Sequence, residues 1–446
     1  MRPRTEPKAG IDLIARRVVA PPPRIGVTIE GMTIAPRHQP GKTPPRSTDP
    51  RFTGLLAEAR GLQPRTVALR RSVHRHPEQG LALPATQAAV LRALEGLPLR
   101  VSTGDALGSV VAVLDGDRPG PAVLLRGDMD ALPITERTGL AFASENVGTM
   151  HACGHDTHVA MLASAARLLT GRRDALAGQV VFMFQPGEEG HHGAERMLAE
   201  GVLEATVNPV ERALALHITA NVRTGALATR PGPMMASADS FTVLVTGKGG
   251  HGALPHRSID PVPPAAEMVG ALQTMLGRRV EATEPVVLTV GRITAGTTTN
   301  VIPETAELAG TIRTLSEPVR RLVHEELRRV CEHVGAAHGC QVEVTIHPGY
   351  AVTVNDEQVG LQVLHLADDV LGAGHSERMA SPMLGAEDFG YVLRRVPGAL
   401  AFLGACPPGV EPDQAAPNHS DQVAFDESAM EQGVAFYAAF ALDALR

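Results

Sequence analysis

The chain alternates between helix-like and strand-like stretches from about residue 53 onward. Residues 53–75 and 157–170 have helical spacing, whereas residues 121–125, 179–184 and 213–216 are short apolar runs typical of buried strands. Strands that are separated by helices form parallel sheets with buried strands. The sequence therefore predicts an α/β fold around a mixed, mostly parallel sheet.

Acidic or histidine side chains follow each of these apolar runs. Asp128 and Asp130 follow the first run, Glu188 and Glu189 the second, and His217 the third. Ligands gather at the carboxyl ends of the strands in such sheets. We therefore expect these side chains to share one edge of the sheet.

The pattern changes after residue 232. Strands are predicted at residues 240–246, 286–293, 305–314 and 341–346, and helices at residues 260–277 and 317–337. This βαββαβ order is that of a ferredoxin-like α+β domain with two layers. Because helix and strand alternation resumes near residue 355, we interpret residues 233–347 as a lid inserted into a main domain of residues 51–232 and 348–446.

The first 50 residues differ in composition from the remainder. They hold ten of the 35 prolines and nine Lys or Arg against four Asp or Glu, so their net charge is about +5. Such a composition cannot pack a core. We predict a disordered, Pro/Arg-rich extension over residues 1–50.

Composition also excludes several kinds of partner. A net charge of -7 and a pI of about 6.2 argue against a nucleic-acid-binding surface. No run approaches the roughly 18 uninterrupted apolar residues that a membrane helix needs. Cys153, Cys331, Cys340 and Cys406 are too few and too scattered for a disulfide framework. We expect a cytoplasmic protein without nucleic-acid or membrane partners.

Residues 150–158 combine three histidines, a cysteine and an aspartate just before a predicted helix. Thiolate and imidazole ligands together suit a transition metal. A buried cysteine next to a helix-capping acid is the alternative interpretation of this segment alone. The metal interpretation gains weight from the other candidate ligands in the chain, which are Glu188, Glu189, His217 and His419.

Glu188 and Glu189 stand side by side in a Pro-Gly turn. Two adjacent like charges are unfavourable unless a cation or a proton separates their roles. One carboxylate can then bind metal while its neighbour acts as a base. A solvated surface turn is the alternative, but the preceding apolar run reads as a central strand that delivers the turn to the sheet's binding edge.

Six motifs occur in one order along the chain, at residues 128–133, 151–156, 185–190, 249–256, 300–303 and 387–389. Together they resemble the aminoacylase and carboxypeptidase superfamily of dinuclear metallohydrolases. The resemblance is to its amidohydrolase branch, which contains hippurate hydrolases and indole-acetyl-amino acid hydrolases, and it covers about residues 55–446.

The resemblance implies a set of site residues. The metal ligands map onto Cys153, His155, Glu189, His217 and His419. Glu188 corresponds to the general base, and Asp130 to an acid that orients a metal-bound histidine. The role of Asp128 stays open, because related branches have a histidine ligand at that place.

The resemblance also implies a reaction. Two divalent ions, manganese, zinc, nickel or cobalt, would activate a water molecule that attacks the amide bond of an N-acyl amino acid. His251 corresponds to the histidine that stabilises the transition state, often from a partner subunit, which implies a homodimer joined through the lid. Asn300 and Arg313 resemble the pair that binds the substrate carboxylate.

Two other interpretations compete with this one. Cys153 could act as the nucleophile of a thiol hydrolase, with His155 or His158 as its base. That interpretation explains neither Glu188 and Glu189 nor His419. The chain could also be a non-catalytic protein that binds amino-acid conjugates, but this requires the loss of a ligand or of the base, and none is missing.

Overall fold

The computed structural model describes residues 49–446. The predicted disordered extension covers residues 1–50, and residues 1–48 of it lie outside the described residues. Pro50 begins a short 3-10 helix. The α-helices are α1 (Leu55–Arg75), α2 (Pro84–Leu94), α3 (His155–Thr170), α4 (Gly193–Ala199), α5 (Val262–Arg279), α6 (Glu317–Ala337), α7 (Glu357–Leu371), α8 (Gly390–Leu393) and α9 (Ala429–Ala444). The 3-10 helices are η1 (Pro50–Phe52), η2 (Arg173–Ala175), η3 (Val202–Glu204) and η4 (Pro255–Arg257).

The larger sheet has the strand order β1-β2-β4-β3-β5-β16-β6-β15. Its strands are β1 (Arg100–Thr103), β2 (Val110–Asp115), β3 (Arg118–Asp128), β4 (Ala177–Gln185), β5 (Val210–Thr219), β6 (Leu227–Thr229), β15 (Ser376–Arg378) and β16 (Gly398–Gly404). The four central strands β4, β3, β5 and β16 are parallel to one another, while β1–β2, β2–β4 and β16–β6 are antiparallel pairs. The predicted mixed α/β class is confirmed.

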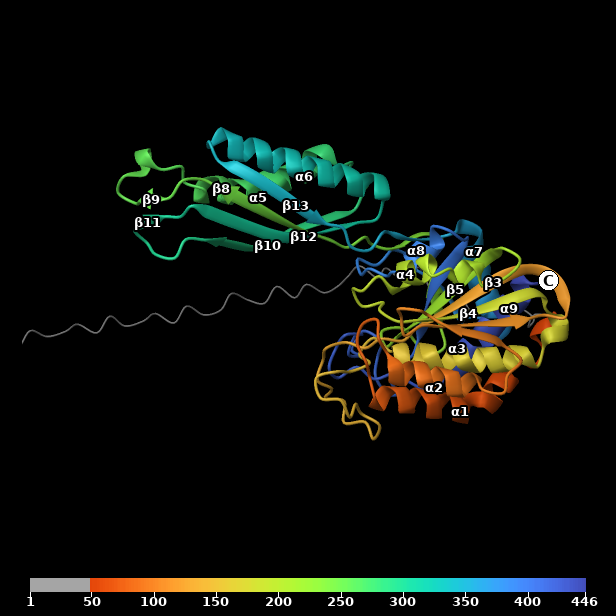
Figure 1. Cartoon of the computed structure of the whole chain (residues 1–446). Helices are drawn as coiled ribbons and strands as arrows, with labels where there is room; N and C mark the ends of the chain where they lie inside the picture. Colours follow the sequence, from red (N-terminus) through yellow and green to blue (C-terminus); the bar gives the residue numbers. More distant parts are fainter. Residues whose placement is uncertain (1–48) are drawn as a thin grey trace, which may run out of the picture. The chain divides into compact units, whose positions relative to one another are not determined.

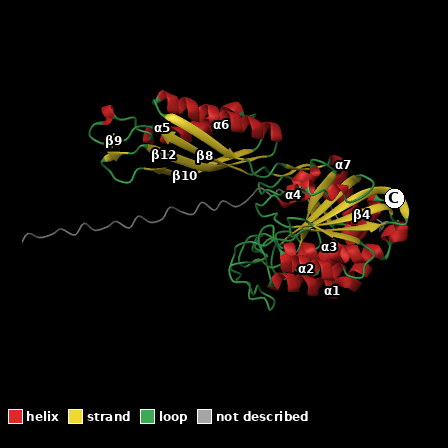
Figure 2. Cartoon of the chain, in the orientation of Figure 1, coloured by secondary structure: helices red, strands yellow, loops and turns green. Residues whose placement is uncertain are grey.

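Helices cover both faces of this sheet (Figures 1 and 2). Val123 and Leu125 of β3 pack into a core with α1, α2, α3, α7 and α9, whereas Leu124 packs into a second core with α4 and α8. This alternation follows from the two-residue period of a strand. Because both faces are buried, the central strands are apolar throughout, as the sequence indicated.

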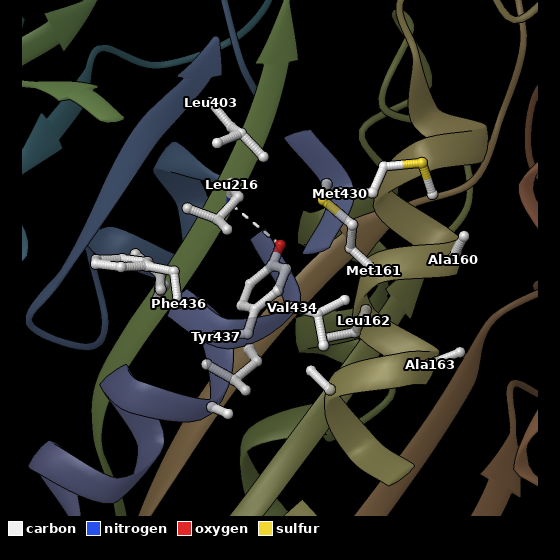
Figure 3. Close-up of a cluster of buried hydrophobic side chains, with 14 of the residues drawn as sticks. Ala160, Met161, Leu162, Ala163, Leu216, Leu403, Met430, Val434, Phe436 and Tyr437 are labelled. Carbon is white, nitrogen blue, oxygen red and sulfur yellow. Dashed lines mark hydrogen bonds between the residues drawn. The ribbon is translucent and has the colours of Figure 1, made fainter. Parts of the chain in front are cut away.

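Tyr437 ties α9 to the centre of the sheet (Figure 3). Its hydroxyl accepts a hydrogen bond from the Leu216 N–H at 3.1 Å and donates to the Arg126 carbonyl at 2.6 Å. The ring lies among apolar side chains that include Met161 and Val434. A buried hydroxyl is tolerated here because both of its hydrogen-bonding roles are satisfied.

A second sheet is formed between residues 239 and 347. Its strand order is β10-β12-β8-β13, and all its pairings are antiparallel. The strands are β8 (Asp239–Thr246), β10 (Val286–Ala295), β12 (Thr305–Thr314) and β13 (Gln341–His347). Helices α5 and α6 share an apolar core with this sheet. Two short ribbons pair β9 (Gly250–His251) with β11 (Val301–Ile302) and β7 (Gly232–Met235) with β14 (Thr353–Asn355).

No helix within residues 49–446 combines the length and the apolar character that crossing a bilayer requires.

The buried carboxylate of Asp239 connects β8 to α6 and to the segment after β13. It accepts hydrogen bonds from Arg320 at 2.6 and 2.9 Å, from His324 at 2.9 Å and from the Gly349 N–H at 3.0 Å. Burial alone would raise the pKa of Asp239, but the hydrogen bonds from His324 and Arg320 lower it to about 2. The ionised form is therefore the one that the fold stabilises.

We predict that Asp239→Asn lowers the free energy of unfolding by about 2–4 kcal/mol at pH 7, because Arg320 then loses its buried counter-ion. The folded-state pKa is depressed, so this contribution is present above the unfolded-state pKa near 4 and disappears as the pH falls towards 2. Urea unfolding followed by circular dichroism measures it. Glu343→Gln, which changes an exposed carboxylate on β13, is the matched control. Equal effects of the two substitutions would contradict the prediction.

Candidate metal centre

The candidate ligands gather at the carboxyl ends of neighbouring parallel strands. The loops after β3 and β4 carry Asp130, Glu188 and Glu189, and His217 lies near the end of β5. Parallel strands present these ends at one edge, so residues that are far apart in the sequence meet there. His217 still pairs with Phe402 of β16, so the strand continues through it and does not stop before it as the sequence suggested.

The thiol of Cys153 lies at the middle of this cluster. Its sulfur is 3.4 Å from Nε2 of His217 and 3.2 Å from Nε2 of His419. Two sets of side chains share this thiol, and within each set the donor atoms lie within 4.8 Å of one another. The sets are Cys153, His155 and His217, and Cys153, Glu189 and His419. The structure thus brings together all five residues that were predicted as metal ligands.

The imidazoles of the buried ligands are oriented for metal binding. Nδ1 of His155 donates to the Asp130 carbonyl at 2.8 Å, and Nδ1 of His217 donates to the Ile218 carbonyl at 2.8 Å. These bonds leave Nε2 of each ring with its lone pair. Nε2 of His155 is buried without a hydrogen-bond partner among the described residues. A buried imidazole nitrogen of this kind, next to a thiol and a carboxylate, fits divalent transition-metal ions.

Tight backbone turns place two of these ligands. Gly154 separates Cys153 from His155 with a φ of +86°, and a Cβ at this position would lie 2.3 Å from a methyl carbon of Ile218. Only glycine satisfies both constraints. His419 has a φ of 70° in the left-handed region, which a non-glycine residue adopts at a cost. The N–H of His419 donates a hydrogen bond to the Ala152 carbonyl at 2.9 Å, so the loop that contains Cys153 stabilises this strained turn.

Asp130 holds the turn that carries the two glutamates. Its carboxylate accepts the N–H groups of Glu188 at 2.9 Å and of Glu189 at 3.0 Å. His155 is bonded through the Asp130 backbone carbonyl, while the closer carboxylate oxygen is 3.6 Å away from the imidazole. Asp130 thus contacts the histidine through its main chain, and its carboxylate positions the two glutamates instead.

Glu188 and Glu189 have opposite electrostatic surroundings. Burial raises the pKa of Glu188 well above its ordinary value, and the carboxylates of Glu387 and Glu189 reinforce this effect. Burial also acts to raise the pKa of Glu189, but the contacts of its carboxylate with His419 and the charge of His155 hold that pKa below its ordinary value. The sequence argument for two different roles therefore has a physical basis in the fold.

Two residues position the site in a way that the sequence did not indicate, and the first, His158, had been considered only as a candidate base for Cys153. His158, one helical turn after His155, contacts the Asp128 carboxylate through Nδ1 and accepts the Ile218 N–H at Nε2, at 2.7 Å. Asp128 also binds Arg126 at 2.6 Å, so the role left open for Asp128 is a buried bridge between β3 and α3. The spacing of His158 on the helix was the only available signal.

Tyr350 is the second such residue. Its hydroxyl donates to the Glu188 carbonyl and accepts the Gly190 N–H at 2.7 Å. The ring is buried and packs edge-on against His192. Nothing in the local sequence around residue 350 indicated this contact, because its partners lie about 160 residues earlier.

The three residues predicted in the lid are outside this cluster. His251 and Asn300 are exposed and lie close together, since β9 and β11 pair and the Gly252 N–H bonds to the Asn300 carbonyl at 2.9 Å. Arg313 lies near the other end of β12. Between Thr305 and Arg313 the strand advances by eight residues, which is about 27 Å. One chain therefore does not bring Asn300 and Arg313 together.

The sheet and this donor set define a class of metal-dependent hydrolase, and comparison with known proteins identifies the family. Residues 124–443 match the sequence profile of Peptidase family M20/M25/M40. The chain belongs to this family and is a hydrolase that acts on amide bonds. The family predicted from the six motifs is thereby confirmed.

Three similar proteins illustrate the range of the family. Thermostable carboxypeptidase 1 of Saccharolobus solfataricus is 36% identical over 392 residues, which cover 87% of this chain and 97% of that protein. N-acetyl-L-cysteine deacetylase of Bacillus subtilis is 37% identical over 348 residues, 77% of this chain and 81% of that one. A solved dinuclear metal-binding peptidase of family M20 from Bacillus subtilis has a TM-score of 0.75 and 33% identity, and the match covers 86% of this chain and 99% of that one.

We predict that Tyr350→Phe leaves the metal content unchanged but lowers kcat for an amide substrate by about tenfold, because the Glu188 turn loses one anchoring hydroxyl. Elemental analysis and steady-state kinetics measure the two quantities. Tyr391→Phe is the matched control, since its hydroxyl contacts His192 and the Gly349 carbonyl instead of the glutamate turn. A loss of metal in Tyr350→Phe would show that the tyrosine supports the ligands and not the base.

Proposed function

We propose that the protein hydrolyses the amide bond of N-acyl amino acids with two divalent metal ions held by the five ligands around Cys153. The observation that carries this proposal is the shared thiol, which belongs to two sets of donors at once. One thiolate, three imidazoles and a carboxylate suit manganese, zinc, nickel or cobalt. When bound, the ions would supply Lewis acidity towards the amide carbonyl and the attacking water.

Glu188 is the proposed general base. Its carboxylate is buried beside Glu189, and its main chain is fixed by Asp130 and Tyr350. A general base transfers protons most effectively when its pKa is near the operating pH. Burial raises the pKa of Glu188 and so brings it closer to that pH. Glu188 would take a proton from the attacking water and pass it to the leaving amine. The products are a carboxylic acid and an amino acid.

The thiol-hydrolase alternative is less well supported by the surroundings of Cys153. Burial raises the pKa of this thiol above its ordinary value, which disfavours a free thiolate nucleophile. Four groups lie near the sulfur, namely His155, His217, His419 and Glu189, whereas a nucleophile needs one base.

Glu188→Gln and Glu189→Gln distinguish the two carboxylates. We predict that Glu188→Gln keeps its metal while turnover falls by about 10²–10⁴-fold, because the variant lacks the proton acceptor. Glu189→Gln loses metal, since an amide is a poorer ligand. Metal analysis and hydrolysis of N-acetyl, N-benzoyl and indole-acetyl amino acids measure both effects. Full activity of protein shown to be free of metal would refute the metal mechanism and favour the thiol hydrolase.

The residues proposed to bind substrate in the lid suggest a homodimer. His251 and Asn300 lie at one end of β12 and Arg313 lies at the other, so one chain cannot direct all three at a small substrate. Two copies can, if His251 and Asn300 of one subunit complete the site in which Arg313 of the other binds the carboxylate. The long edge strand β10 is largely exposed, which also favours pairing with another chain.

We propose the remaining organisation on the same basis. Residues 51–232 and 348–446 form the metal-binding catalytic domain, and residues 233–347 form the lid through which the subunits associate. The separate sheet and core of residues 239–347 support this division. The four free cysteines support a cytoplasmic location, where thiols stay reduced.

Mixing two inactive variants tests the shared site. In a heterodimer of His251→Ala and Glu188→Gln, one site has an intact base and receives an intact His251 from the other chain. We predict that random subunit exchange restores about a quarter of the wild-type activity, because half of the dimers then hold one working site of two. Native mass spectrometry verifies exchange. If exchange is complete and no activity returns, His251 acts within its own chain.

A further inference from the structure

Helices α1, α2 and α3 lie side by side (Figures 1 and 2). A groove lined by residues of all three helices opens between them. Its volume is about 270 Å³. Small side chains from all three helices line it, among them Ala68, Ala93 and Ser164. Because these side chains are short, the three helices leave a hollow between them that larger residues would have filled.

Three arginines surround this hollow, one from each helix. They are Arg65 of α1, Arg92 of α2 and Arg167 of α3. Among the described residues none of the three has an ion-pair partner within 4.0 Å. Other arginines of α1 differ in this respect, since Arg60 pairs with Glu431 and Arg71 with Glu427. The groove is therefore a local concentration of uncompensated positive charge.

Two of these arginines, Arg65 and Arg167, repel each other. Nη2 of Arg167 donates to the Ala93 carbonyl at 2.9 Å, which holds this guanidinium beside α2. Burial lowers the pKa of Arg167, and the charge of Arg65 lowers it further. An anion bound between them would relieve this repulsion.

We propose that the groove binds a small organic carboxylate whose compact apolar body lies against the alanine side chains that line it. Guanidinium groups pair with carboxylates through two parallel hydrogen bonds. The volume is just below that of pockets for drug-sized ligands, so the occupant has about the size of one ring or a short branched chain.

The groove is separate from the metal centre. Arg167 follows His155 by twelve residues on α3, and at 1.5 Å per residue the two lie about 18 Å apart along the helix. None of the five metal ligands lines the groove. Binding there can thus be distinguished from binding of the same carboxylate at the catalytic site.

Hydrogen-exchange mass spectrometry of the metal-loaded protein tests the proposal with benzoate as the probe. We expect benzoate to slow amide exchange in α2, which contributes nothing to the metal cluster. The double variant Arg65→Gln/Arg92→Gln should weaken this protection by about tenfold or more in apparent affinity. Ala68→Leu keeps all three charges but narrows the groove, which Ala68 lines, and it should weaken binding as well.

Three controls make the result decisive. Arg328→Gln removes an exposed arginine on α6 and should leave the protection of α2 unchanged. Benzamide has the same shape without the charge, and inorganic phosphate has the charge without the apolar body, so neither should protect α2 at the same concentration. Equal protection by benzamide or by phosphate would overturn the proposal, as would unchanged benzoate binding in the double variant. Retained amide hydrolysis in each variant shows that it is folded.

Discussion

The buried guanidinium of Arg126 organises the edge of the sheet where the metal ligands meet. It is fully buried and binds Asp128 at 2.6 Å, Glu387 at 2.8 Å and Asp388 at 3.0 Å. A charge in this environment is tolerated only when its partners stay in place. Residues about 260 positions apart in the sequence are therefore forced together at the end of β3, and the loop that contains Glu387 is held near Glu188.

This arrangement also explains why neighbouring glutamates differ. The carboxylates of Asp128, Glu188, Glu387 and Asp388 outnumber the single guanidinium that they surround. Burial and the excess of negative charge together raise the pKa of Glu188. Glu189 differs because its carboxylate contacts His419 at 3.3 Å, and the charges of His419 and His155 lower its pKa. The opposite pKa shifts of the two residues thus depend largely on Glu387, Asp388 and His419, which lie about 200 residues or more further along the chain.

Hydrophobic periodicity predicted most of the helices and strands, because it reflects which side chains of each element are buried. Helix α1, strand β4, the four strands of the second sheet and helices α5 and α6 fall within about two residues of their expected bounds, whereas the short strands β9 and β11 were not expected. The antiparallel pairings at the sides of the large sheet were not predictable, since the apolar pattern of a sequence does not indicate which strands are neighbours. The five candidate metal ligands could be identified through the family resemblance that the six motifs carry, and the structure brings them together. Tyr350, and the bonds that the Asp130 side chain makes to the glutamate turn, depend on tertiary partners that a single sequence does not reveal.

The exposure of His251 has a mechanistic consequence. A donor that stabilises a developing oxyanion is effective in a site from which water is excluded, where its hydrogen bond is not weakened by solvent. In this chain the imidazole of His251 is exposed, and its Nδ1 already accepts the Ala253 N–H at 3.0 Å, which leaves Nε2 to donate. The tautomer is therefore the one that the proposed role of His251 requires, but the exposed surroundings are not. Val301, its partner in the β9–β11 ribbon, is also half exposed. Both features are those of a surface that another molecule covers, and a second copy of the chain that delivered this ribbon to a metal centre would desolvate the donor and bury the apolar side chain in one step.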